Sequence, residues 1–451
     1  MLGRSARSRA MGCLVVILAV TGDLPRGARA AAGPAAIPRF LLSTEGCGRA
    51  TGYAESNKIV TCKGRTHVAW LDSAPEGFRV RVRTLEHTTG RWSPTTTVGD
   101  AYDNHGGPAL AIDSRGFLHV AYYPHHHPMR YRRSVRPNDA SAWTKPERIG
   151  KRCTYPTLLV GPDDTLYLTC RETTSTHWVV NLYVRKPNGP WSPARAILRS
   201  RHTGYAHFQE ALAWGPDRKT LHLSCRIYEG PKGRSQTVGY LLSRDFGRTW
   251  RRADGQVVER PATSATVDAI ASLGGAAPAA GGQSLRCGAI AVDAQGVPYV
   301  LYSTADARGG DLLLARPDAG GAWRRTSIAR QAASTWPGGL LKMPGGLACD
   351  ARGRLCAAAT ICRPRPGRNE SLWGHPTNEV AWLVLGGDGR LLDATLLTVP
   401  DPNTSRWLAN VERPTGWNRP QRPAVIYTAG PPGQKNTQRL SNKVYWVRPN
   451  P

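Results

Sequence analysis

Acidic residues and long apolar segments are both scarce in this 451-residue chain. Lys and Arg total 60 against 32 Asp and Glu, which leaves a formal net charge of +28. Such an excess attracts polyanions to a protein surface, although arginine richness that reflects genome composition is the alternative explanation. Beyond the N-terminal region, no run approaches the roughly 18 apolar residues that a membrane-spanning helix needs. Helix-period apolar stripes are almost absent as well, which argues against a helical fold.

The N-terminal segment has the pattern of an export signal. Arg4, Arg7 and Arg9 precede the apolar run Met11–Val20, and Ala28–Ala30 offers a cleavage site between small residues. We therefore expect residues 1–30 to be a signal peptide and the protein to be secreted or periplasmic. The alternative is a short N-terminal membrane anchor. Residues 31–451 remain for the folded part, and we expect them to form one domain.

Cysteine usage fits an oxidising compartment. One of the ten cysteines lies in the expected signal, so nine remain, and several of them are expected to pair. Cys47 with Cys62, Cys153 with Cys170, and two of Cys349, Cys356 and Cys362 each flank one expected hairpin. An odd count leaves at least one free thiol or metal ligand.

A turn followed by an alternating strand recurs along the chain. The chain is also rich in turn formers, with 48 Gly and 35 Pro. The repeated turn centres on Gly64, Gly116, Asp164, Asp217, Gly296, Gly353 and Gly389. Most of the intervals between these positions suit one four-stranded unit, and period-2 strands at such spacing predict a β-propeller. Seven turns predict seven blades.

Aromatic residues mark the same register. Trp92, Trp143, Trp191, Trp250 and Trp323 recur near the expected blade ends, where an indole can wedge between neighbouring sheets. The segment 243–250 reads S-R-D-F-G-R-T-W, which matches the Asp-box pattern of sialidase-like blades. We interpret it as purely structural, because its carboxylate and glycine stabilise a hairpin tip.

The ends of the chain are expected to close the ring. Lys443–Val447 has the pattern of a last strand that pairs with a strand near Arg39–Leu42, and such closure removes exposed sheet edges. The fold class predicted from the sequence is therefore all-β, a seven-bladed sialidase-like propeller with one Asp box.

Two histidine-bearing loops form the first candidate site. Asn104 and His105 precede one expected strand, and His125 and His126 follow the next. A hairpin turning at Asp113–Gly116 would bring both loops to one end of a blade. Catalysis is one interpretation of this pair. A metal site that includes the histidine run and an exposed polar loop are the others.

The next expected blade repeats this layout with other side chains. Tyr155 precedes a strand and Arg171 follows the next one. A phenol, two imidazoles and a guanidinium suit β-elimination on a uronate. The guanidinium would stabilise the carboxylate as it becomes enolate-like, and Tyr or His groups would remove the C5 proton and protonate the departing O4. No carboxylate pair is needed.

The span from about His105 to Glu229 resembles the BNR-repeat family that includes ulvan lyases and related uronate lyases, which are seven-bladed propellers. The resemblance rests on a D-N-H segment, a His after the G-x-L-H-V strand, a Y-P pair and an Arg that closes the next hairpin. It implies that His125 and Tyr155 transfer protons, that His105 positions substrate or acts as base, and that Arg171 neutralises the uronate. Which group is the base stays open.

A third region has the same hairpin layout. Tyr205 and Arg226 are expected to form a sugar subsite together with Asn104 and His126. The resemblance also implies a structural metal, zinc or calcium, which the chemistry does not require. Its nearest candidate ligands are His207, His222 and Cys225, although their spacing matches no standard zinc signature.

The predicted function is a polysaccharide lyase that acts on a uronic-acid-containing polysaccharide, with or without ulvan-like sulfation. Because an export signal is present and no nucleic-acid-binding module is evident, an acidic glycan is the expected partner rather than a nucleic acid. We expect a monomer. A sialidase-like hydrolase, for which Tyr228 and Glu229 are available, and a non-catalytic glycan-binding propeller are the alternatives.

Overall fold

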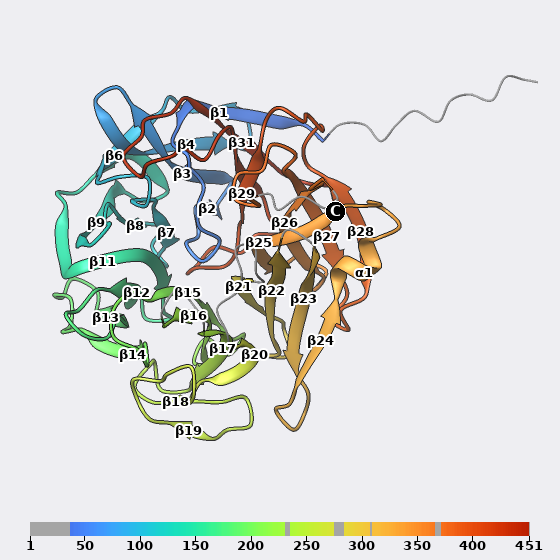
Figure 1. Ribbon diagram of the computed structural model, residues 1–451. Coiled ribbons are helices and arrows are strands. Elements are labelled where there is room, and N and C mark those ends of the chain that lie inside the picture. The colour runs from blue at the N-terminus through green and yellow to red at the C-terminus, as the bar shows by residue number, and fades with distance from the viewer. Residues whose placement is uncertain (1–36, 231–234, 275–283, 307–308, 366–370, 451) are drawn as a thin grey trace, which may run out of the picture. The chain divides into compact units, whose positions relative to one another are not determined.

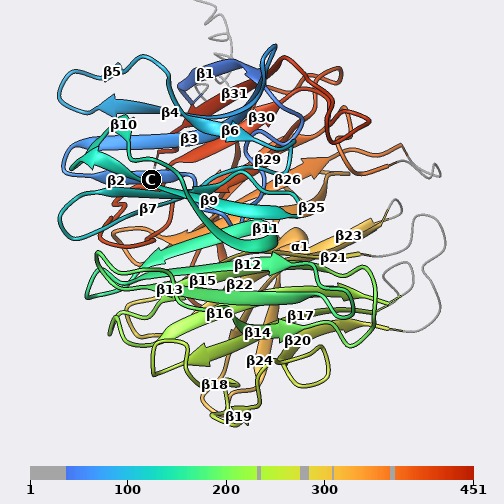
Figure 2. The same cartoon turned by 90° about the vertical axis from the view of Figure 1, so that its left-hand side faces the viewer.

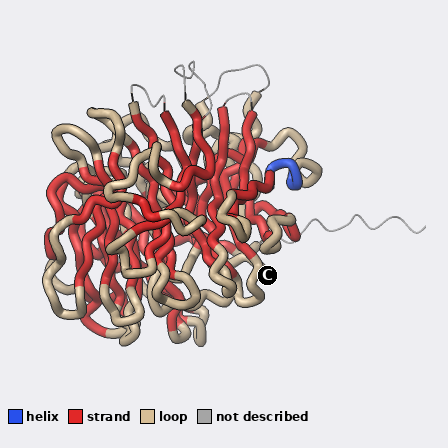
Figure 3. Tube along the Cα trace, turned by 90° about the horizontal axis from the view of Figure 1, so that it is seen from below, coloured by secondary structure: helices blue, strands red, loops and turns tan. Residues whose placement is uncertain are grey.

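The computed structural model describes residues 37–230, 235–274, 284–306, 309–365 and 371–450. The expected signal peptide lies outside these ranges. Strands dominate the described part, whose single helix is the five-residue α1 (Ile328–Ala332) (Figure 3). No helix of this part has the length and apolar character that crossing a membrane requires.

Seven four-stranded antiparallel blades surround a central axis (Figure 1). The first three consist of β2 (Ile59–Cys62), β3 (Arg65–Ala74), β4 (Gly77–Glu86) and β6 (Thr96–Ala101); of β7 (Ala109–Ile112), β8 (Leu118–Tyr122), β9 (His127–Arg136) and the start of β11 (Glu147–Val160); and of the rest of β11 with β12 (Leu166–Glu172), β13 (Val179–Arg185) and β14 (Arg195–Arg199). The seven-bladed propeller predicted from the sequence is confirmed.

The remaining blades follow in chain order around the ring (Figure 1), and the edge-on view shows the earlier blades in succession from β3 through β11 and β13 to β17 (Figure 2). They consist of β15 (His207–Trp214), β16 (Leu221–Glu229), β17 (Ser235–Ser243) and β20 (Asp268–Leu273); β21 (Ser284–Val292), β22 (Pro298–Asp306), β23 (Gly309–Pro317) and β24 (Trp323–Ser327); β25 (Leu340–Cys349), β26 (Leu355–Cys362), β27 (Glu379–Leu385) and β28 (Leu391–Leu396); and β29 (Arg406–Val411), β30 (Val425–Ala429), β31 (Asn442–Val447) and β1 (Arg39–Gly46). Short strands β5 (Arg91–Trp92), β10 (Asp139–Trp143) and β18 (Trp250–Arg251) pair with the third strands β4, β9 and β17, and β19 (Val257–Val258) pairs with β18.

The repeated turn marks six of the seven inner hairpins. The seventh marker, Gly389, is wrong as a blade marker, because it lies between β27 and β28 on the outer side of the sixth blade. The inner hairpin of the seventh blade is closed by a long connection, residues 412–424. This loop has no glycine-type turn of the repeated kind. The seventh blade therefore carries no copy of the repeated turn, and the sixth blade carries two.

The core lies between blades, as in two packed sheets. One cluster joins Leu159 and Tyr167 of the third blade to Phe208 and Leu223 of the fourth, and it contains the fully buried Trp250. Trp250 ends the Asp box, in which Thr249 N and Oγ1 donate to the Asp245 carboxylate over 2.8 and 2.7 Å. The structural interpretation of this motif is confirmed.

The expected disulfides are not present. No disulfide joins the described cysteines, although the side chains of the predicted pair Cys153 and Cys170 lie within hydrogen-bonding distance of each other. Cys47 N donates to Leu71 O whereas Cys62 lies opposite Arg65, so about 20 Å of strand separates these two cysteines. Cys349 and Cys356 belong to clusters on opposite faces of their hairpin. A disulfide needs Cα atoms closer than about 7 Å and converging Cβ vectors.

Strand β1 closes the ring as predicted. Arg39 lies opposite Val447 and Leu41 opposite Tyr445 in the antiparallel pairing of β1 with β31. Leu42 points into the core between the first and last blades, where it is 4% exposed, whereas Leu41 is 39% exposed. The two termini of the described domain thus share one blade.

This closure yields a stability prediction with an adjacent control. Leu42→Ala should lower the free energy of unfolding by about 2–4 kcal/mol, because it leaves a cavity in the core. Leu41→Ala on the other face should change it by less than about 0.5 kcal/mol. Urea unfolding followed by tryptophan fluorescence measures both values, and equal losses would contradict the assigned faces of β1.

Candidate active site

A central pocket lies where the inner strands begin, and all seven blades contribute to it. It encloses about 260 Å³. Its walls combine guanidinium, imidazole and phenol groups with backbone from the fifth to seventh blades; they are Arg49, Tyr53, Ala54, His105, Tyr155, Tyr205, His207, Gln209, Arg286, Cys287, Met343, Pro344, Gly345, Thr360, Trp373, Leu408 and Ala409. None of these described lining residues is Asp or Glu.

Asp103 joins the two predicted imidazoles. Its Oδ1 accepts from His105 N over 2.8 Å and lies 3.1 Å from His105 Nδ1, while its Oδ2 lies 2.5 Å from His125 Nδ1. The two rings stack with centroids 3.9 Å apart. Although burial opposes it, these hydrogen bonds hold the pKa of Asp103 well below its usual range. Because both imidazoles face the Asp103 carboxylate with Nδ1, their Nε2 atoms point away from it.

The two imidazoles differ in what their Nε2 atoms meet. Nη1 of Arg49 contacts Nε2 of His105, and a guanidinium can only donate. His105 therefore accepts at Nε2 and donates at Nδ1 to Asp103. Burial lowers its pKa to about 3, against the hydrogen bond to Asp103. Within the described residues, Nε2 of His125 has no hydrogen-bond partner, and its side chain is 17% exposed.

Tyr155 lies across the pocket in a strained backbone conformation. Its φ is +60°, and it falls at an irregularity in the pairing of β11 with β12 between Thr154 and Thr157. Such strain in a non-glycine residue concentrates at functional sites. The buried ring lies 5.0 Å from that of His207 and 5.9 Å from that of His105. Burial raises the pKa of Tyr155 well above its usual value, so the phenol stays protonated.

The predicted arginines lie behind the pocket wall. Arg171 is buried, with its guanidinium 4.7 Å from the Tyr155 ring centroid and 4.8 Å from that of Trp178. Arg226 donates to Gln236 Oε1 over 3.0 Å and supports His207 from 3.5 Å. The guanidiniums that line the pocket are instead Arg49 and Arg286.

The other predicted subsite residues are dispersed. Tyr205 lines the pocket, is 57% exposed and packs against Trp178 at 4.9 Å. His126 is not among the lining residues; its Nδ1 is 2.6 Å from Thr173 Oγ1 and its ring centroid 4.6 Å from that of His125. Asn104 is 4% exposed and is not among the lining residues, whereas the adjacent His105 is. Asn104 therefore does not contact the pocket directly.

The expected metal ligands do not converge. His207 lies opposite Tyr228 at the start of β15, whereas His222 lies opposite Ala213 near its end, a separation of about 20 Å along the strand. His207, His222 and Cys225 therefore cannot share one ion. Potential ligand atoms of Asp103, His105 and His125 do lie within 4.8 Å of one another, but hydrogen bonds and the adjacent Arg49 charge account for that arrangement without a cation.

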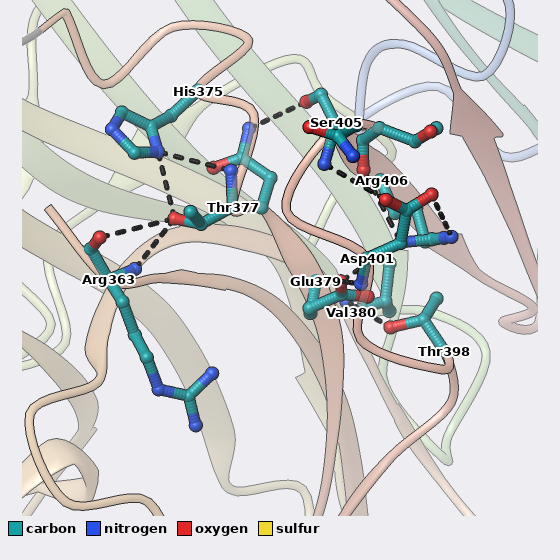
Figure 4. A network of polar contacts seen from close by, with 12 residues as sticks. Arg363, His375, Thr377, Glu379, Val380, Thr398, Asp401, Ser405 and Arg406 are labelled. Carbon is teal, nitrogen blue, oxygen red and sulfur yellow. Dashed lines mark hydrogen bonds and ion pairs between the residues drawn. The ribbon is translucent and has the colours of Figure 1, made fainter.

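A polar network on the sixth and seventh blades lies close in sequence to Trp373, one of the residues that line the pocket (Figure 4). In this network Arg406 Nη1 donates to Glu379 Oε1 over 3.0 Å, and Thr377 Oγ1 accepts from Arg363 N over 2.9 Å (Figure 4). Trp373 itself packs edge-on against the buried Trp407 at 4.5 Å and lies 5.4 Å from the Arg49 guanidinium.

Sequence reasoning missed several of these residues. Asp103 stood beside the predicted His105, and its place two residues before a loop histidine was a usable signal. Arg49, Tyr53, Arg286 and Trp373 lie on blades without a recognisable motif, and only the closed ring brings them to the pocket.

Comparison with known proteins agrees with this architecture. The model of the BNR repeat-containing family matches residues 65–331. Ulvan Lyase-PL25 of Pseudoalteromonas sp. (strain PLSV) is 22% identical over 315 residues, which are 61% of this chain and 61% of that protein. The match thus spans less than two thirds of that relative.

Solved structures extend the likeness over most of the chain. A polysaccharide lyase of family PL25, an ulvan lyase, superposes with a TM-score of 0.68 at 15% identity and covers 91% of this chain and 96% of its own. The same figures hold for that lyase bound to -[GlcA(1-4)Rha3S]-. The polysaccharide lyase Uly1 gives a TM-score of 0.55 at 15% identity, covering 90% of this chain and 97% of its own. At such identities the likeness establishes the fold.

The environment of His105 predicts an imidazole that stays neutral from pH 8 to about pH 4, because its pKa in the folded protein is about 3. Nitrogen-15 NMR, with the signal assigned through His105→Gln, measures this directly. An unfolded histidine binds its proton near pH 6.5, so between these values the unfolded chain holds more protons and stability falls as pH falls. Titration of His105 near pH 6.5 would contradict the assignment.

Proposed function

Because this chain belongs to the BNR repeat-containing family, whose model spans more than half of it, we propose that it is a polysaccharide lyase that cleaves a uronic-acid-containing polysaccharide by β-elimination. One observation carries the proposal. His105 faces the protonated Tyr155 in a pocket whose described lining holds guanidiniums and no carboxylate, and His125 stacks directly behind His105 on the same buried Asp103.

The charge of the pocket favours a uronate. Arg49 and Arg286 line it, and Arg171 adds a third positive charge behind Tyr155. Guanidiniums bind carboxylates through paired hydrogen bonds, and their interaction strengthens as negative charge moves onto the carboxylate in an enolate-like transition state. We assign Arg49 and Arg286 to direct contact and Arg171 to electrostatic support.

The hydrogen-bond pattern assigns the proton transfers. His125 donates at Nδ1 to Asp103, which leaves the Nε2 lone pair to remove the C5 proton. Tyr155 keeps its proton and can deliver it to O4 as the C4–O4 bond breaks and the C4=C5 double bond forms. His105 accepts from Arg49 and therefore positions that guanidinium. Asp103 stabilises the imidazolium that forms on His125.

The alternatives fit the pocket less well. Retaining and inverting hydrolases use a carboxylate pair, or a tyrosine with a carboxylate partner. Glu229 accepts from Arg201 N and contacts Ser264, and it is not among the lining residues of the pocket. A purely glycan-binding propeller would need neither the shared carboxylate of Asp103 nor the strained Tyr155.

A panel of acidic polysaccharides tests the reaction class. Incubation with the purified protein should raise ultraviolet absorbance in at least one case, because β-elimination creates a conjugated unsaturated uronate. Ulvan is the first candidate, because the PL25 lyase that shares this fold is described with -[GlcA(1-4)Rha3S]-. New reducing ends without absorbance would indicate hydrolysis instead, and retention without either signal would indicate a lectin.

Substitution of the proton-transfer groups tests the roles. His125→Gln and Tyr155→Phe should each lower kcat by roughly 10²–10⁴-fold, the usual contribution of a general acid or base, while polysaccharide retention in affinity electrophoresis stays within about threefold. His87→Gln, an exposed histidine beside the outer end of β4, is the control and should be neutral. A larger kcat loss in His105→Gln than in His125→Gln would reverse the base assignment.

A further inference from the structure

A second pocket lies at the opposite ends of the inner strands. Strands β15, β21 and β25 begin at the central pocket and end at this second one, which Trp214, Val292 and Cys349 line. It encloses about 380 Å³, more than the central pocket. The connection from β29 to β30 supplies its remaining wall. We call it the opposite pocket.

The interior of the opposite pocket is apolar. Ile290 and Leu347 are almost completely buried in its floor, and Trp214 forms one side. Trp214 is held in place because its Nε1 donates to Val160 O over 2.9 Å. The rim is open to solvent at Pro216 and Pro414. An apolar cavity with an open rim and few polar groups is the usual form of a small-molecule site.

The polar groups of the opposite pocket are mainly cationic. Arg218 donates to the carbonyls of Gly416 and Gly161 over 3.3 and 3.4 Å, and Arg419 to those of Gly416 and Asn418 over 3.2 and 3.0 Å. Backbone carbonyls orient these guanidiniums without neutralising them, and no ion pair involves either within the described ranges.

A third guanidinium reaches the pocket from its inner side. Arg413 is 2% exposed and donates to Ala54 O over 3.3 Å. Its Nε and that of Arg218 are buried donors without a partner among the described residues. Leaving such donors unpaired costs free energy.

The one carboxylate in the pocket wall is already engaged. Asp293 accepts from Gln295 N, Val297 N and Tyr299 Oη over 2.9, 2.8 and 3.0 Å, so it fixes its own turn. Arg218 also lies 4.1 Å from the ring centroid of Trp417, which presents its charge beside a flat apolar surface. The pocket therefore combines apolar walls with the guanidiniums of Arg218 and Arg419, which form no ion pair among the described residues.

We propose that the opposite pocket is a second, non-catalytic binding site for a small organic carboxylate with an apolar body. The carboxylate pairs with Arg218 and Arg419 at the rim, and the apolar body rests on Ile290, Leu347 and Trp214. Paired hydrogen bonds from guanidiniums supply the selectivity for the anion. This site is independent of the proposed lyase reaction, which uses the other end of the inner strands.

Benzoate and benzamide form a matched pair of probes, because they share shape and differ in charge. Isothermal titration of the purified full chain at pH 7 should show one benzoate site and at least about tenfold weaker benzamide binding. Arg218→Gln and Arg419→Gln should each weaken benzoate by about tenfold or more. Arg419 is exposed, so its substitution is expected to leave folding intact, which the melting temperature verifies.

Arg49→Gln in the central pocket is the control and should leave the benzoate affinity within about twofold. Equal binding of benzamide would overturn the anion requirement. Loss of benzoate binding in Arg49→Gln, with binding retained in Arg218→Gln and Arg419→Gln, would place the ligand in the central pocket and overturn the proposal. Absence of benzoate binding to the unsubstituted chain would overturn it as well.

Discussion

The pairing of β1 with β31 is the contact on which the candidate active site depends. It joins the two ends of the described domain in one blade and leaves no open edge in the ring. The segment that follows β1 then turns over the axis, where Thr51 Oγ1 donates to Leu408 O over 2.7 Å. This segment carries Arg49 and Tyr53 into the central pocket. Ring closure and assembly of the pocket wall are therefore the same structural event.

The central pocket holds features that cost free energy and that a substrate would offset. Tyr155 and His126 have φ values of +60° and +58°, a conformation that persists in non-glycine residues only when surrounding contacts enforce it. Desolvation lowers the pKa of Arg286, and none of the described residues that line the pocket with it carries a carboxylate. A bound uronate would supply the missing negative charge. The proposed preference for an anionic ligand is thus supported by the desolvated cations as well as by the net charge of the protein.

Local signals in the sequence were sufficient for the blades and for the first half of the site. The inner turns, the Asp box and the alternating strands are set by residues close in sequence, and the hairpin between His105 and His125 obeys the same local rule. Predictions about which residues from different blades meet in space were wrong or incomplete. Arg286 and Trp373 come from blades without motifs, Arg171 and Arg226 lie behind the wall rather than on it, and strand register separates His207 from His222. The pairs Cys47–Cys62 and Cys349–Cys356 were wrong for the same reason, because proximity along the chain does not fix the direction of a side chain, whereas Cys153 and Cys170 do lie side by side.

The connection from β29 to β30 lies at the ends of the inner strands that face away from the central pocket. Val160 N donates to Thr415 O and Trp417 N to Ile112 O, so this loop spans to the second and third blades. At Gly416 a Cβ atom would lie 2.1 Å from Ile112 O, which only glycine avoids. Arg413 then reaches from the loop to Ala54 O, directly beneath the pocket wall. In the proposed reaction, the lining guanidiniums of Arg49 and Arg286 are desolvated and act in a medium of low dielectric constant, where stabilisation of an enolate-like carboxylate is greatest.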